Sequence, residues 1–79
     1  MSVRHARIAD ELAAQIHRLL AGQGPEVQGA AIADLAAIWL AGHLVLGKPD
    51  ATATMRRELF DAHCRAVWEL VEHYDARRK

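Results

Sequence analysis

Hydrophobic residues along this chain recur at helical spacing, and no run alternates between apolar and polar positions as a strand would. Two breaks interrupt the pattern, at residues 22–25 and 47–50, and each combines a glycine with a proline. Glycine is typical of the end of a helix, and proline is typical of its first turn. The pattern therefore predicts three helices, over residues 2–21, 25–46 and 51–77.

Short connections between successive helices require an up, down, up course. We expect a single all-α domain over residues 1–79, built as a three-helix antiparallel bundle that is either monomeric or dimeric. A chain of 79 residues is near the lower limit for folding on one core. The open alternative is a helical hairpin that dimerises to complete its core.

The first predicted helix carries one apolar stripe and one charged face, which is typical of a surface helix that docks on a core. Ser2 precedes it and is the candidate N-cap, because a serine hydroxyl accepts hydrogen bonds from the first turn. The apolar stripe consists of Ile8, Leu12, Ile16, Leu19 and Leu20. The opposite face carries Arg4, Arg7, Glu11, Gln15 and Arg18.

The two sides of the second predicted helix differ in size rather than in polarity. A bulky arc is expected to form the core, and it consists of Val27, Ile32, Leu35, Ile38, Trp39, Val45 and Leu46. Alanines occupy the other side, namely Ala30, Ala33, Ala37 and Ala41. Gly29 and Gly42 fall inside the predicted helix, where each costs about 1 kcal/mol relative to alanine. Such glycines are tolerated where another backbone comes close, so the alanine side is a candidate surface for a second helix.

The third predicted helix is long, and Asp50 or Thr52 could cap its start. Its apolar arc consists of Met55, Leu59, Phe60, Ala66, Val67, Leu70, Val71 and Tyr74. Asp61 and Arg65 are spaced to form an ion pair on the polar side. Trp68 also falls on this polar side, which the fold does not require. Either it is an interface anchor, since tryptophan beside charged residues is typical of one, or it covers the first helix.

Composition narrows the possible functions. Ten basic and ten acidic residues cancel, so the chain lacks the electrostatic footprint of a nucleic-acid binder. Cys64 is the only cysteine, so no intrachain disulfide can form and nothing indicates an oxidising compartment. The N-terminus carries no apolar signal core, and the longest apolar stretch, residues 30–46, is short for a membrane span. We therefore expect a cytoplasmic protein without membrane contact.

Candidate chemistry is sparse. No two of the five histidines are three or four residues apart, so the spacing predicts no metal site. No phosphate-binding loop, nucleophile motif or cofactor motif is present, so we expect neither a cofactor nor an enzyme. His5 and His63 are expected at the edge of the core. His63 lies within the apolar arc of the third helix and is either a hydrogen-bonded core histidine or, if buried, a pH-sensitive element.

One segment resembles a known group of proteins. Residues 24–43, with the sequence GPEVQGAAIADLAAIWLAGH, resemble a stretch of short helical proteins from rhizobia and related α-proteobacteria. Some small proteins of these bacteria are antiactivators, which bind quorum-sensing transcriptional activators and silence them. The resemblance spans about a quarter of the chain. It implies transcription regulation by protein–protein interaction, and it assigns no individual functional residue.

These observations favour a small regulatory protein that binds another protein, and the resemblance implies that it would sequester a transcriptional activator. The residues expected to form the binding surface are Trp39, Asp61, Arg65, Trp68, Ala33, Ala37 and Ala41. A DNA-binding helix-turn-helix variant is an alternative, and it would require Arg56, Arg57 and Arg65 to face a phosphate backbone. A structural homodimer without a separate ligand is a third possibility.

Overall fold

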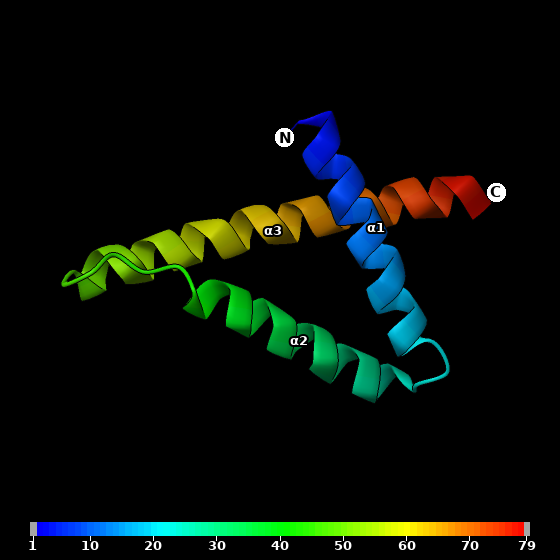
Figure 1. Cartoon of the computed structure of the whole chain (residues 1–79), viewed down its shortest axis with the longest axis horizontal. Coiled ribbons are helices and arrows are strands. Elements are labelled where there is room, and N and C mark those ends of the chain that lie inside the picture. Colours follow the sequence, from blue (N-terminus) through cyan, green and yellow to red (C-terminus); the bar gives the residue numbers. More distant parts are fainter. Residues whose placement is uncertain (1, 79) are drawn as a thin grey trace. The chain divides into compact units, whose positions relative to one another are not determined.

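The computed structural model describes residues 2–78, and within them the chain forms three α-helices and no strand (Figure 1). They are α1 (Val3–Leu20), α2 (Pro25–Ala41) and α3 (Pro49–Arg78). The predicted all-α class is therefore confirmed. The antiparallel bundle, the dimer and the single domain stay predictions.

Both ends of α1 agree with what the sequence predicts. The hydroxyl of Ser2 accepts a hydrogen bond from the backbone N–H of His5 at 3.1 Å, so the predicted N-cap is confirmed. Gly22 follows the helix with a φ of 84°, in the left-handed region that only glycine adopts at little cost. The glycine therefore turns the chain out of α1.

The end of α2 differs from the expectation, because the helix stops at Ala41 and not near Leu46. Gly42 consequently follows the helix, and its assignment as an intrahelical glycine was wrong. Gly29 does lie inside α2, but no atom lies within 4 Å of the place its Cβ would occupy, apart from its own helical surroundings. Among the described residues of its own unit, no close backbone approach of the kind expected at Gly29 is therefore present.

The start of α3 also differs. The helix begins at Pro49, where a missing N–H costs nothing because the first N–H groups of a helix have no internal partner. The first helical hydrogen bond runs from the N–H of Thr52 to the carbonyl of Lys48 at 3.0 Å. Asp50 and Thr52 therefore lie inside α3, and the expectation that one of them is its N-cap was wrong.

The chain divides into two compact units, one up to Ala33 and the other from Asp34 onward. Neither unit buries a side chain among residues 2–78. The expectation that the bulky arc of α2 forms a core is therefore wrong in this structure, and Ile38 on that arc is 70% exposed. Partial burial within the second unit concentrates where the end of α2 meets α3, at Ala36, Leu40, His43, Val45, Thr52, Met55, Arg56, Leu59 and Cys64.

Candidate protein-interaction site

The C-terminal end of α2 is fully hydrogen-bonded. The last four carbonyls of a helix have no partner within it and must find one elsewhere. Here each accepts one bond: Ile38 from the Gly42 N–H at 3.1 Å, Trp39 from His43 Nδ1 at 2.7 Å, Leu40 from the His43 N–H at 3.0 Å, and Ala41 from Arg56 Nη2 at 3.1 Å. Because a carbonyl only accepts, Nδ1 of His43 carries the proton. Two side chains thus complete the helix end.

Arg56 joins α3 to this helix end. Its Nε donates to the carbonyl of His43 at 2.9 Å, and its Nη2 donates to the carbonyl of Ala41 at 3.1 Å. The guanidinium also places a positive charge at the negative end of the α2 dipole. Arg56 is half-buried, and two of its five N–H groups bond to the backbone, which leaves fewer donors for the phosphate contact that the helix-turn-helix alternative requires.

Thr52 holds the connection between α2 and α3. Its Oγ1 accepts a hydrogen bond from the N–H of Val45 at 2.9 Å and donates one to the carbonyl of the same residue at 3.2 Å. Val45 is half-buried although it lies outside any helix. One hydroxyl therefore satisfies both backbone groups of a residue in the middle of the connection.

An aromatic cluster lies beside the Arg56 contacts. The ring of Trp39 lies 5.5 Å from that of His43 and 5.3 Å from that of His63, measured between centroids. His63 in turn stacks on Phe60 at 6.4 Å. His63 is exposed, so its expected place at the edge of a core was wrong, and the same holds for His5 on α1. The cluster fixes the side of α2 that faces α3.

The residues expected to form a binding surface on α3 do share one face. Asp61, Arg65 and Trp68 follow each other at spacings of four and three along a continuous helix, and all three are exposed. Trp68 is 69% exposed. The ion pair expected between Asp61 and Arg65 is not formed, and within residues 2–78 the salt bridge that is present joins Arg78 to Asp75 at 3.9 Å. Both charged groups beside Trp68 are therefore available to a ligand.

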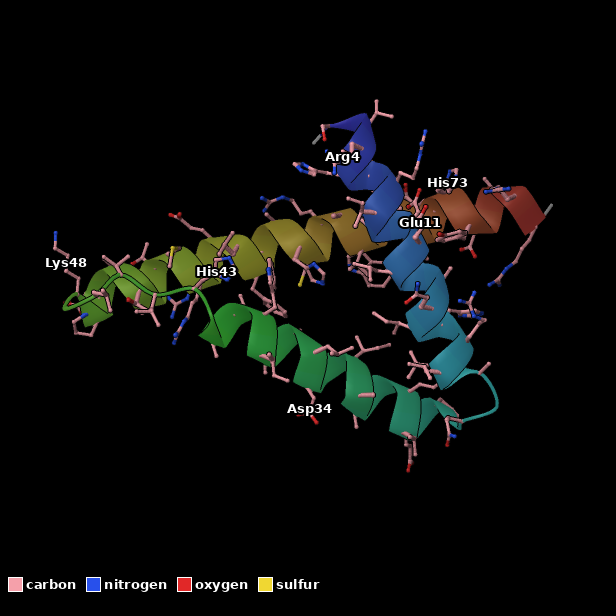
Figure 2. All side chains as sticks on the ribbon, viewed as in Figure 1. Arg4, Glu11, Asp34, His43, Lys48 and His73 are labelled. Atoms are coloured by element: carbon pink, nitrogen blue, oxygen red, sulfur yellow. The ribbon has the colours of Figure 1, made fainter. Side chains whose placement is uncertain are left out.

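The expected residues on α2 do not form one surface. Trp39 contacts His63 on α3, whereas Ala37 and Ala41 lie on a different side of the helix, since neighbouring positions differ by about 100°. Figure 2 shows Asp34, which the sequence places beside the alanines, extending from α2 on the side away from α3. Ala33 falls in the first unit. The alanine strip is thus a separate surface from the aromatic cluster.

The contacts between the C-terminal end of α2 and the start of α3 are called the α2–α3 joint below. Sequence reasoning missed His43, Thr52 and Arg56 as the residues that form this joint. It also missed an open hollow of about 360 Å³ at the same end of the second unit, lined by residues 44–49 and by Thr52, Ala53 and Arg56. The run of three apolar residues before Gly47 was the available signal, although its spacing predicts the last turn of a helix. Because that turn is absent, the side chains of this run lie around the hollow instead.

Two further findings concern the part of the chain that the structure describes. No cluster of three or more histidine, cysteine, aspartate or glutamate side chains is placed there to hold a metal ion. None of the described helices is both long enough and apolar enough to cross a membrane. Comparison with known proteins yields no matching family model, no matching curated protein and no matching solved structure.

Proposed function

We propose that this chain is a small regulatory protein that binds another protein stoichiometrically and catalyses no reaction. The observation that carries the proposal is the exposed tryptophan on a charged helix face. Trp68 is 69% exposed, and Asp61 and Arg65 beside it have no partner in one another. Tryptophan and arginine are among the residues that contribute most to binding energy in protein interfaces.

The lack of a core in either unit supports the same function. Burial of apolar surface is the main source of folding free energy, and neither unit buries a side chain among residues 2–78. The apolar arc of α3 continues beyond Phe60 and His63 through Val67, Leu70 and Tyr74, all of which are exposed. We propose that the three helices form an antiparallel bundle in the complex with the partner, so that folding and binding are coupled.

The proposed partner class comes from the resemblance of residues 24–43 to short α-proteobacterial proteins. An antiactivator would bind a transcriptional activator in the cytoplasm and prevent its action. Quorum sensing is the regulatory setting that the resemblance implies. The exposed alanines Ala37 and Ala41 support this version, because small side chains allow a partner helix to approach closely.

A homodimer is the second candidate, and the same lack of a core favours it. A second copy would cover the apolar arc of α3 without any other ligand. The two candidates differ in concentration dependence, since self-association makes thermal stability rise with protein concentration. Sedimentation of the purified chain between micromolar and millimolar concentrations separates them: a monomer throughout excludes the homodimer.

The test of the proposed function is recovery of a stoichiometric partner with the tagged chain from its own host. Trp68→Ala should abolish recovery while the far-ultraviolet circular dichroism stays unchanged. Trp68→Phe keeps an aromatic ring and should retain most of the binding, whereas Glu69→Ala, one position away on the helix, should have little effect. Recovery of the partner at wild-type yield with Trp68→Ala would refute the proposal.

A further inference from the structure

The connection between α2 and α3 has an ordered backbone. Besides the two bonds of Thr52 to Val45, the N–H of Lys48 donates to the carbonyl of Val45 at 3.1 Å, and Arg56 holds the carbonyl of His43. Gly47 has a φ of 72°, which allows the chain to turn tightly before α3. Since these bonds fix the connection, the hollow that it lines is formed before any ligand arrives.

The walls of this hollow are largely aliphatic. Leu44, Val45, Leu46, Pro49 and Ala53 supply apolar side chains, and the volume of about 360 Å³ is ample for a branched aliphatic group. Leu46 is 85% exposed, although nothing in the turn requires a leucine there. A single exposed leucine is ordinary, but a cluster around a hollow is typical of a contact site.

The charged residues that line the hollow are both positive. Lys48 projects from the turn, as Figure 2 shows, and Arg56 is the lining residue that belongs to α3 further along the chain. The bonds of Arg56 to the backbone use two of its five N–H groups, so others remain able to donate. No aspartate or glutamate is among the lining residues. The hollow therefore combines an apolar pocket with a cationic rim.

We propose that this hollow docks an aliphatic side chain from a segment of the partner protein that carries carboxylates next to that side chain. The inference rests on the proposed protein-binding function and names the chemistry of one part of the partner. Leucine or isoleucine flanked by aspartate or glutamate fits both features: the branched side chain fills the aliphatic pocket, and the carboxylate pairs with Lys48 or Arg56. Trp68 lies about twelve residues further along α3 than Arg56, so the two contacts are separate.

The chemistry of the hollow can be tested without the partner. In ¹H–¹⁵N spectra of the full chain, 4-methylpentanoate should shift the amides of residues 44–48 together with Thr52, Ala53 and Arg56. Affinity should lie in the low millimolar range, as expected for a fragment of this size. The amide 4-methylpentanamide has the same shape without the charge and should bind several-fold more weakly. No titrating shift at about 20 mM, or equal binding of acid and amide, would overturn the inference.

Blocked peptides distinguish a protein segment from a free small acid. One peptide carries leucine between two aspartates, and its counterpart carries leucine between two lysines; both are labelled for fluorescence polarisation. Lys48→Glu should weaken the acidic peptide at least fivefold. Arg57→Glu changes the chain's net charge equally, is not a lining residue, and should alter the affinity less than twofold. Equal effects of the two variants would show general charge attraction and overturn the docking inference.

Three outcomes test this inference against a free small acid as the ligand and against the proposed function. If the fragment binds but the blocked acidic peptide does not, the occupant is a free small acid and the docking inference fails. If neither binds while partner recovery still depends on Trp68, the proposed function stands and the docking inference fails. Binding of both probes in the hollow, with a partner recovered independently of Trp68, would support the docking inference and refute the role of Trp68.

Discussion

The two halves of α3 belong to the same unit and differ in how their side chains are used. Near the start of the helix, Thr52 and Arg56 make four hydrogen bonds to the backbone of the segment that precedes α3, and they are half-buried. Beyond Cys64 every described side chain is exposed, including Trp68, and the salt bridge found there is local. The first half therefore holds this unit together, whereas the second half presents apolar and charged groups that its own unit does not use.

The largest effect is expected for Arg56→Ala. The substitution leaves the carbonyls of Ala41 and His43 without donors and removes a charge from the end of the α2 dipole, so the free energy of unfolding should fall by about 2 kcal/mol. Arg57→Ala, at the next position, should change it by less than about 0.5 kcal/mol. Urea titration followed by tryptophan fluorescence measures both. If the two variants lowered the free energy of unfolding equally, the contacts of Arg56 with the end of α2 would not be what stabilises this unit.

Thr52→Val should come next. The variant keeps the shape but removes the hydroxyl that bonds both backbone groups of Val45, at a cost of about 1–2 kcal/mol. Thr52→Ser retains the hydroxyl and should lose much less. Hydrogen exchange of the Val45 amide is the direct measurement, because this N–H should exchange faster in the valine variant only. Unchanged protection would show that Thr52 does not hold the connection.

The joint also shows which parts of the structure the sequence could predict. The all-α class, the Ser2 cap and the positions of the breaks follow from local signals, namely helical periodicity, serine, glycine and proline. The end of α2 at Ala41 could not be predicted, because its last carbonyl is satisfied by Arg56, fifteen residues further along the chain. Thr52 was interpreted as a local cap for the same reason: its actual partner, Val45, lies on the other side of the turn.

The candidate surface shows a similar division. Helical spacing alone placed Asp61, Arg65 and Trp68 on one face, and the continuous helix α3 keeps them there. The sequence alone could not show that Trp39 and the alanine strip belong to different surfaces. The orientation of the Trp39 side chain depends on its contact with His63 on another helix. The hollow depends on three apolar residues that lie outside any helix, and helical periodicity gives no information about that conformation.

A smaller effect sharpens the contrast between the two halves. Leu40→Ala, in the half-buried joint, should lower the free energy of unfolding by about 1 kcal/mol, and Leu70→Ala should cost less than about 0.5 kcal/mol in the free chain. Thermal unfolding at two protein concentrations measures both variants. If Leu70→Ala lowered the free energy of unfolding as much as Leu40→Ala or more, the apolar side of the second half of α3 would already be buried in the free protein. Dependence of that cost on concentration would assign the cover to a second copy.

The smallest effect concerns the charges beside Trp68. Asp61 and Arg65 have helical spacing for an ion pair but do not form one within 4 Å, so a double-mutant cycle with alanine should give a coupling below about 0.3 kcal/mol in the free chain. When affinity for the partner is measured instead, each single alanine substitution should weaken binding by more than this coupling. The reason is that each charge would contact a group on the partner, and the substitution removes that contact. A strong coupling in the free chain, with no loss of affinity from either substitution, would show that these charges serve the helix itself. The second half of α3 would then present only Trp68 and the apolar arc, and the predicted interface would shrink to those groups.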